Sequence, residues 1–249
     1  MPEMWDLEGK TALVTGGARR LGRAVSWALA EHGANVAVHY RTSANEAEAL
    51  AAAIRQLNVM SWAIAADLGD CAQAAALFSR VVDLAGPVDV LVNNAAIFLE
   101  SRLCEVSAED IQSNLNVNAL APLLISREFA AQGREGAIVN FLDTRMVDYD
   151  HNHVAYHLGK RTLFALTRMM ALEFAPKLRV NAVAPGLILP PEGENESYLE
   201  DLASTNPLNR YGAADDVVEA VLFLLRSRFI TGQVIFVDGG RHIKGSVYG

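Results

Sequence analysis

Thr11-Ala-Leu-Val-Thr15-Gly16-Gly17-Ala18-Arg19-Arg20-Leu21-Gly22 decides the fold, because an apolar strand runs there into a glycine-rich turn that opens a helix. The glycines let the backbone approach a pyrophosphate closely, and the free N–H groups and dipole at the helix start favour negative charge. Tight turns need glycine anyway, but the place of this turn between the first strand and the first helix is informative. The stretch predicts a phosphate-binding site.

Apolar strand-like runs alternate with longer helical patterns along the rest of the chain. Seven runs are predicted to be strands, namely 11–15, 36–40, 62–66, 88–92, 137–142, 180–183 and 234–237. Continuous apolar strands separated by helices indicate a parallel sheet that is covered on both faces. The sequence therefore predicts an α/β protein, a doubly wound Rossmann fold with a seven-stranded parallel sheet and helices on both faces.

Local signals mark two helix ends and one long loop. Ser43-Ala-Asn-Glu46 is typical of a capping box, and Gly33 is typical of a stop after the first helix. Residues 187–210, rich in Pro, Glu and Asn, are predicted to form a substrate loop with one short helix. No linker, low-complexity tract or repeat divides the sequence, so residues 1–249 are interpreted as a single domain.

Composition and charge argue against several classes of protein. The chain has 249 residues, 51% hydrophobic and 20% charged, which permits a large core and argues against disorder. A formal net charge of −8 provides no broad basic field, so no nucleic-acid partner is expected. The start of the chain lacks a charged segment followed by an apolar run, and no long uncharged apolar stretch occurs elsewhere. No membrane association is expected.

The cysteines and histidines provide no metal signature. Cys71 and Cys104 lie in different segments without CxxC or zinc spacing, so a cytoplasmic, reducing environment fits best. His151, His153 and His157 have no matching carboxylate or thiol spacing. No metal site is predicted.

The end of the second strand bears on the choice of cofactor. A cofactor with a free ribose 2′-hydroxyl would usually meet an acidic residue about 20 residues past the turn. The sequence there is His39-Tyr40-Arg41-Thr42-Ser43, without an acid. Arg41 and Arg20 could hold a 2′-phosphate through charge-assisted bonds, which favours NADPH over NADH. The alternative is that both arginines are solvated surface charges.

Tyr156 and Lys160 stand four residues apart, so on a helix both side chains leave from one face. A nearby ammonium would move the tyrosine pKa from about 10 towards the working pH. Asp143 stands thirteen residues before Tyr156 and completes a predicted proton-delivery site. The alternative for the Tyr–Lys pair is an ordinary amphipathic surface pair.

Several motifs together resemble the short-chain dehydrogenase/reductase family over essentially the full chain. They are the turn at 15–22, Asp67, Asn93-Asn94-Ala95-Ala96, Asn118, Tyr156 with Lys160, Pro185-Gly186 and Val237-Asp238-Gly239-Gly240. The resemblance implies that Tyr156 is the proton donor, that Lys160 binds the nicotinamide ribose and that Asn118 holds a water in a proton relay. It also implies a homotetramer built through helix pairs and the last strand.

The same resemblance assigns residues to the cofactor, with Asp67 near the adenine and Pro185-Gly186 near the nicotinamide. The expected NADPH-binding residues are Gly16, Arg19, Arg20, Leu21, His39, Tyr40, Arg41, Thr42, Ala66, Asp67, Leu68, Asn94, Ala95, Ala96, Tyr156, Lys160, Pro185, Gly186 and Leu187.

Two departures from the family pattern resemble one subgroup, the pteridine reductases and the bacterial dihydromonapterin reductases. Arg20 replaces the middle glycine of the turn, and Asp143 replaces the catalytic serine. The approach His153-Val-Ala-Tyr156 is a further similarity. By this resemblance Phe98 stacks on the pterin, and the expected substrate-binding residues are Phe98, Asp143, Tyr156 and Leu187. Ala96 differs from the subgroup, which has a serine there.

Asp143 also bears on the reaction by its chemistry. Carbonyl reduction builds negative charge on oxygen, which an ionised carboxylate would repel. Reduction of a C=N bond passes towards a cationic iminium, which a carboxylate stabilises, and a protonated carboxyl could supply the proton with Tyr156. The alternative is that Asp143 only caps the strand end or pairs with Arg145, and Phe98 could likewise be an ordinary core residue.

The sequence predicts an NADPH-dependent oxidoreductase acting on pterin-like C=N bonds, such as those of dihydromonapterin or dihydrobiopterin, with dihydrofolate as a side substrate. One alternative is a carbonyl reductase of a 3-oxoacyl thioester or a small ketone. Another is a cofactor-sensing protein that has lost catalysis, against which Tyr156, Lys160 and Asn118 together argue.

Overall fold

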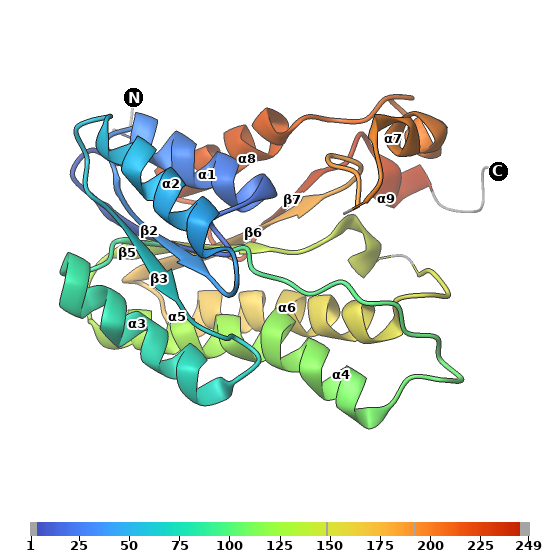
Figure 1. Ribbon diagram of the computed structural model, residues 1–249, viewed down its shortest axis with the longest axis horizontal. Helices are drawn as coiled ribbons and strands as arrows, with labels where there is room; N and C mark the ends of the chain where they lie inside the picture. Colours follow the sequence, from blue (N-terminus) through green and yellow to red (C-terminus); the bar gives the residue numbers. More distant parts are fainter. Residues whose placement is uncertain (1–3, 148, 192, 245–249) are drawn as a thin grey trace.

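The computed structural model describes residues 4–147, 149–191 and 193–244. At its centre lies a parallel sheet of seven strands in the order β3-β2-β1-β4-β5-β6-β7 (Figure 1). The strands are β1 (Thr11–Thr15), β2 (Asn35–Tyr40), β3 (Ser61–Ala65), β4 (Val90–Asn93), β5 (Gly136–Phe141), β6 (Leu178–Pro185) and β7 (Val234–Val237). All seven predicted strands and the fold class are confirmed.

Helices cover both faces of the sheet. They are α1 (Arg20–Glu31), α2 (Ala44–Arg55), α3 (Cys71–Ala85), α4 (Ala108–Leu115), the π-helical turn η1 (Asn116–Leu120), α5 (Ala121–Ala131), the 3-10 turn η2 (Thr144–Met146), α6 (Val154–Glu173), α7 (Glu196–Leu202), the 3-10 turn η3 (Ala203–Thr205), α8 (Ala214–Arg226) and α9 (Arg241–Lys244). Helices α1, α2 and α8 lie on one face, and α3, α4, α5 and α6 lie on the other (Figure 1).

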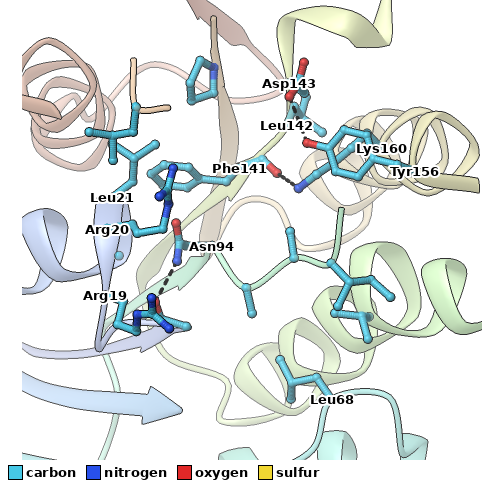
Figure 2. Close-up of a pocket in the computed structure, with 18 of the residues that line it drawn as sticks. Arg19, Arg20, Leu21, Leu68, Asn94, Phe141, Leu142, Asp143, Tyr156 and Lys160 are labelled. Atoms are coloured by element: carbon cyan, nitrogen blue, oxygen red, sulfur yellow. Dashed lines mark hydrogen bonds between the residues drawn. The ribbon is translucent and has the colours of Figure 1, made fainter. Parts of the chain in front are cut away.

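The strand order reverses at β1, which pairs with β2 on one side and with β4 on the other. In open parallel sheets, ligands bind outside the carboxyl ends of the strands at such a reversal. The turn after β1 carries Arg19, Arg20 and Leu21, and it lies across from the segment after β5 that carries Asp143 (Figure 2). This edge of the sheet is therefore where a site is expected.

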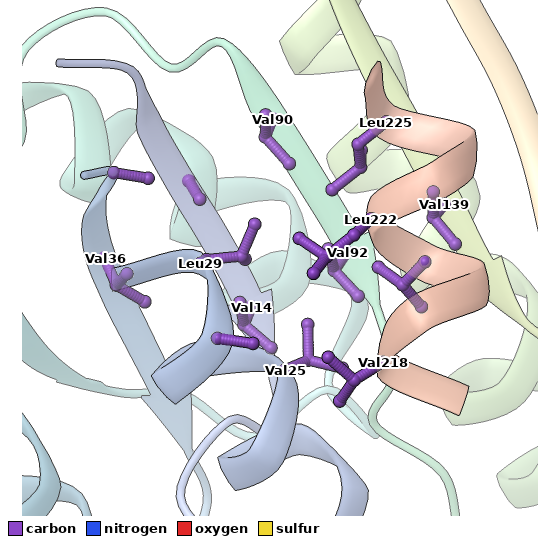
Figure 3. Close-up of a cluster of buried hydrophobic side chains, with 14 of the residues drawn as sticks. Val14, Val25, Leu29, Val36, Val90, Val92, Val139, Val218, Leu222 and Leu225 are labelled. Atoms are coloured by element: carbon purple, nitrogen blue, oxygen red, sulfur yellow. The ribbon is translucent and has the colours of Figure 1, made fainter. Parts of the chain in front are cut away.

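The central strands are buried on both faces, because successive side chains of a strand point to opposite sides. Every residue of β1, β4 and β5 is buried. Val14, Val92 and Val139 contribute to the cluster beneath α1 and α8 (Figure 3), whereas Leu13, Leu91 and Ile138 contribute to the cluster against α3 and α5. The two cores explain why these strands read as uninterrupted apolar runs.

Two of the three local signals hold. Gly33 has a φ of 80° and follows the end of α1, as predicted. The described part of the segment 187–210 is largely irregular and contains the short helix α7. The capping box at Ser43 is wrong, because the Ser43 side chain caps no backbone N–H and its backbone (φ −89°, ψ 57°) lies outside the extended conformation usual for an N-cap. A capping box occurs instead at Ser107, with Asp110.

Among the helices of the described residues, none has the length and apolarity needed to cross a bilayer.

Candidate active site

A cavity of about 460 Å³ opens at the carboxyl edge of the sheet and extends from the glycine turn to the start of α6 (Figure 2). The predicted residues that line it are Gly16, Arg19, Arg20, Leu21, His39, Arg41, Asp67, Leu68, Asn94, Ala95, Ala96, Asp143, Tyr156, Lys160, Pro185 and Gly186. Residues at or just after the ends of six strands, β1 to β6, thus meet around one space.

The glycine turn is fastened to the end of β4. Thr15 Oγ1 accepts the backbone N–H groups of Asn94 and Ala95 at 3.0 and 3.1 Å. Asn94 Nδ2 donates to the carbonyls of Thr15 and Gly16 at 2.9 and 3.1 Å. A Cβ added to Gly22 would lie 2.1 Å from the Gly16 carbonyl oxygen, so the turn closes only with glycine there.

His39 joins the turn to the ends of β2 and β3. Its Nδ1 accepts the Gly16 N–H at 3.0 Å, and its Nε2 lies 3.1 Å from the Ala66 carbonyl oxygen. Burial lowers the His39 pKa to about 4, so the ring is neutral at pH 7 and Nε2 carries the proton that Ala66 accepts. His39 therefore lines the cavity in a position fixed by the Gly16 N–H and the Ala66 carbonyl.

Arg20 adopts a backbone conformation that favours glycine, with a φ of 53°. Its guanidinium donates to the Pro190 carbonyl oxygen at 2.5 Å and so connects the glycine turn to the segment after β6. Arg19 and Arg41 are exposed and also line the cavity. The glycine turn and three arginines suit a dinucleotide carrying three phosphates, which fits NADPH in shape and charge.

Asp143 accepts two hydrogen bonds beside Tyr156. The Tyr156 hydroxyl donates to Oδ2 at 2.9 Å, and the backbone N–H of Arg145 donates to Oδ1 at 2.7 Å (Figure 2). Asp143 is thus both the partner of Tyr156 and the cap of the turn η2. The guanidinium of Arg145 pairs with Asp150 instead.

The turn η2 is also anchored to the end of β7. Thr144 Oγ1 donates to Asp238 Oδ2 at 2.5 Å. Gly186 packs so closely on Asp238 that an added Cβ would lie 2.6 Å from the Asp238 Cβ. These contacts fix the backbone of Asp143 against the strand that ends at Pro185.

The Tyr–Lys pair differs electrostatically from the sequence-based prediction. Lys160 Nζ donates to the Phe141 carbonyl oxygen at 2.7 Å and lies 5.7 Å from the Tyr156 ring centre (Figure 2). Burial, then the Asp143 charge and its hydrogen bond, raise the Tyr156 pKa well above 10. Burial lowers the Lys160 pKa to about 8, and Asp143 opposes that shift. The expectation that the Tyr156 pKa moves from about 10 towards the working pH is therefore wrong.

Asn118 lies in the π-helical turn η1 and is fully buried. Its Oδ1 accepts the Ile97 N–H at 3.0 Å, and its Nδ2 donates to the Ile97 carbonyl and to Asn114 Oδ1 at 3.0 and 3.1 Å. An added Cβ on Gly159 would lie 2.9 Å from the Asn118 Cβ, so α6 approaches closely here. Asn118 holds the segment after β4, and its relay role stays a prediction.

Phe98 is 46% exposed, so the reading of it as an ordinary core residue is wrong. Its ring stacks on His153, with ring centres 3.9 Å apart and an interplanar angle of 15°. It meets the Tyr156 ring nearly perpendicularly at 4.7 Å. Phe98 therefore lies directly beside Tyr156.

Some predicted residues lie outside the lining of this cavity, and others were missed. Those outside are Tyr40, Thr42, Ala66, Phe98, Asn118 and Leu187, the last of which lines a smaller neighbouring cavity. Gly22, which belongs to the predicted phosphate-binding turn, also lines the cavity, and lining residues that the sequence did not single out are Ile97, Val117, Phe141, Leu142, Ile188 and Leu189. Most of these are apolar residues that come shortly after the end of a strand. Their position in the sequence could have been used to predict that they line the cavity.

Among residues 4–147, 149–191 and 193–244, no group of three or more His, Cys, Asp or Glu side chains is arranged so that it could hold a metal ion. His153 and His157 instead contact Asp150.

Several known reductases are similar to this chain over most of its length. A family model described as enoyl-(acyl carrier protein) reductase matches residues 16–242. The 3-oxoacyl-(acyl-carrier-protein) reductase FabG of Staphylococcus aureus strain Mu50 is 34% identical over 242 residues, covering 94% of this chain and 98% of that protein. The L-xylulose reductase of Mus musculus is 36% identical over 245 residues, covering 94% and 97%.

A solved structure is also closely similar. It is described as FolM alternative dihydrofolate reductase 1 from Brucella canis complexed with NADP. Its TM-score is 0.92 at 32% sequence identity, and the match covers 97% of both chains.

Proposed function

The chain belongs to the short-chain dehydrogenase/reductase family, and from this premise we propose that it is an NADPH-dependent reductase of pterin-like C=N bonds. The substrates would be 7,8-dihydropterins such as dihydromonapterin or dihydrobiopterin, with dihydrofolate as a side substrate. The observation that carries the proposal is the hydrogen bond from the Tyr156 hydroxyl to Asp143 Oδ2 at 2.9 Å.

NADPH is supported as the cofactor by the cavity and by the relative that was solved with NADP. The backbone at Gly16 and the start of α1 would hold the pyrophosphate, and Arg41 with Arg20 would hold the 2′-phosphate. Asn94 and Ala95 would follow the cofactor towards Lys160 and Gly186. When bound, NADPH supplies the hydride that reduces the ring carbon of the C=N bond.

Tyr156 would deliver the proton to the ring nitrogen. Its raised pKa keeps the phenol protonated, and a phenolate beside an ionised Asp143 would place two negative charges 2.9 Å apart. A protonated Asp143 avoids this conflict, because its proton replaces the one that Tyr156 gives up and the negative charge ends on the carboxylate. An ionised Asp143 serves a nitrogen that is protonated first, because it stabilises the iminium cation.

The route with an ionised Asp143 does not suit an ordinary ketone as well. Carbonyl reduction needs hydrogen-bond donors aimed at the oxyanion, and an ionised Asp143 would present an acceptor beside the only hydroxyl donor proposed here. Lys160 would position the nicotinamide ribose rather than act on the substrate, since its ammonium already contacts the Phe141 carbonyl.

The second candidate is a carbonyl reductase acting on a 3-oxoacyl thioester, which the similarity to the staphylococcal FabG favours. A direct test incubates the purified protein with NADPH and either dihydrobiopterin or acetoacetyl thioester, and follows NADPH consumption. Faster turnover of dihydrobiopterin supports the proposal. Turnover of the thioester alone would replace it with the second candidate, and turnover of neither would favour a protein without this catalysis.

We also infer a homotetramer in the cytosol. Leu158, Met169 and Leu172 are 43%, 62% and 83% exposed and share one face of α6, because their spacing follows the helical repeat. An exposed apolar row on a long helix favours pairing with another helix. Cys71 and Cys104 are both unpaired, which suits a reducing compartment.

A further inference from the structure

Asp150 is the centre of a cluster of side chains beside Tyr156. Its Oδ1 accepts His153 Nδ1–H at 2.9 Å and the backbone N–H of Asn152 at 2.8 Å. Its other oxygen pairs with the Arg145 guanidinium. The Asp150 N–H donates to His157 Nε2 at 3.2 Å. One carboxylate thus holds residues of the η2 turn and of the start of α6 together.

His153 connects this cluster to the Phe98 ring. The imidazole stacks face to face on Phe98, with ring centres 3.9 Å apart. Burial and the Arg145 charge lower the His153 pKa, which favours a neutral ring whose Nδ1–H is donated to Asp150. Because that hydrogen bond fixes the orientation of the imidazole, it also fixes the tilt of the aromatic ring stacked on it.

The backbone around Phe98 is fastened to the same place. The Ser101 N–H donates to the Asn152 carbonyl at 2.6 Å, and the Val154 N–H donates to the Ser101 carbonyl at 3.0 Å. Ser101 Oγ accepts the Ala155 N–H at 3.0 Å. The segment after β4 therefore runs beside the first residues of α6, and Phe98 is held both by its backbone neighbours and by its ring.

Asp150 also supports the position of Asp143, through Arg145. Arg145 pairs with Asp150 through its side chain and donates its backbone N–H to Asp143 Oδ1 at 2.7 Å. The Phe98 ring meets the Tyr156 ring at 4.7 Å, and Tyr156 in turn bonds Asp143. A continuous series of contacts through Asp150 and His153 thus connects the Phe98 ring, the Tyr156 hydroxyl and the Asp143 carboxylate.

We propose that Asp150 and His153 are positioning residues that hold Phe98 at a fixed tilt beside Tyr156 and Asp143, and that they thereby select a flat ring as substrate. This inference rests on the proposed function, which supplies the planar substrate. A preformed aromatic surface loses no side-chain freedom when a flat ring stacks on it, whereas a flexible acyl chain gains little from the same surface.

The test compares His153→Ala, His153→Phe and Asp150→Asn with a matched control, His151→Ala, which changes an exposed histidine two residues away. The Michaelis constant and turnover number for dihydrobiopterin are measured, together with the dissociation constant of oxidised biopterin in the presence of NADP. The NADPH dissociation constant and thermal midpoint report on folding. Should His153→Ala fold poorly, His153→Leu fills similar space without an aromatic face.

His153→Ala is expected to raise both the Michaelis constant and the biopterin dissociation constant about tenfold, with the turnover number within about twofold of wild type. His153→Phe should restore part of the loss, because it retains a stacking face but lacks the hydrogen bond to Asp150. Asp150→Asn should lose less biopterin affinity than His153→Phe, because the imidazole stays in place and an amide oxygen still accepts its N–H. His151→Ala should match wild type, and the Michaelis constant for acetoacetyl thioester should not change in any variant.

Unchanged biopterin affinity in His153→Ala, in a protein where Phe98→Ala weakens it, overturns the positioning role and leaves the proposed function intact. Equal losses in His153→Ala and His153→Phe also overturn it, because the stacking face would then be irrelevant. A wild-type protein that neither reduces dihydrobiopterin nor binds biopterin overturns the proposed function, and this inference with it.

Discussion

Tyr156 donates its hydroxyl to Asp143 across 2.9 Å, so the tyrosine is paired with an acid and not with the lysine four residues along the helix. Burial, and then the Asp143 charge and this hydrogen bond, raise the Tyr156 pKa, which is opposite to the direction expected from the sequence. A site with this charge arrangement keeps a proton in place and disfavours a phenolate, which suits donation to a basic ring nitrogen.

Tyr156→Phe should lower the turnover of dihydrobiopterin by about a hundredfold to ten-thousandfold, because the substituted ring has no proton to deliver. The NADPH dissociation constant, measured by fluorescence titration, should stay within about twofold. Tyr149→Phe removes a hydroxyl from a tyrosine that is 72% exposed and serves as the control. Turnover that is unchanged in Tyr156→Phe would remove this residue from the mechanism.

Asp143→Ser should shift the substrate preference from dihydrobiopterin towards acetoacetyl thioester. Loss of the carboxyl should lower kcat/KM for dihydrobiopterin about a hundredfold, and the new hydroxyl should raise kcat/KM for acetoacetyl thioester. Asp143→Asn is the matched comparison, because it keeps an acceptor for the Arg145 N–H but adds no hydroxyl. If both variants reduce dihydrobiopterin as well as wild type does, the acid has no role in the reaction.

Arg41→Ala should weaken NADPH binding about tenfold or more, because the variant loses the charge-assisted hydrogen bond to the 2′-phosphate. NADH has no 2′-phosphate, so its binding should not change. Isothermal titration of both cofactors measures the difference. Arg23→Ala removes an exposed arginine of α1 that lies outside the cavity lining, and it should affect neither cofactor. Equal weakening of NADH and NADPH by Arg41→Ala would contradict a 2′-phosphate contact.

The buried His39 should make the fold sensitive to mild acid. Its pKa is about 4 in the folded chain against an ordinary value of 6.5, so only the unfolded chain takes up the proton between these values. The resulting stability is complete above pH 6.5 and is lost as the pH falls towards 4, by about 3 kcal/mol.

Denaturant unfolding at a series of pH values measures this loss. His39→Asn should be less stable than wild type at pH 7, because it loses the two hydrogen bonds, but its stability should fall less steeply on acidification. The exposed His151→Asn should keep the wild-type slope. Parallel curves for wild type and His39→Asn would show that another group controls the response.

Leu172→Glu should break the proposed tetramer, because a charge would then lie in the apolar row on α6. Sedimentation velocity should show smaller species than wild type at the same concentration. Phe229→Glu places the same charge at a fully exposed position outside α6 and should leave the assembly unchanged. A wild-type protein that sediments as a monomer would dispose of the tetramer itself.

The sheet could be predicted because its strands carry their own signal. Burial on both faces leaves β1, β4 and β5 almost continuously apolar, and the glycines of the first turn occupy positions that no larger residue can fill. Motifs that follow a strand end, such as Asn94 or Asp143, could be placed in the cavity for the same reason, since parallel strands end at one edge.

Other features depend on contacts between distant segments and could not be predicted. The local sequence at Ser43 satisfies a capping pattern, but the backbone there (φ −89°, ψ 57°) is not extended and the side chain caps no N–H group. Leu187 was expected in the site, whereas Ile188 and Leu189 line it and Leu187 lines a neighbouring cavity. The Asp150 cluster joins a loop to two other segments, and no spacing in the sequence marks it.

The double burial of the central strands also determines where this protein can change in evolution. A strand with no solvent side tolerates a polar residue only where it finds a hydrogen-bond partner, as Asn93 and Asn140 do, so variation in β1, β4 and β5 is restricted to residues of similar volume that are apolar or find such a partner. Libraries that aim at new substrates should therefore randomise the segments 96–98, 143–153 and 187–190 and leave the scaffold untouched. In such a fold, adaptability and robustness are properties of separate parts of the chain.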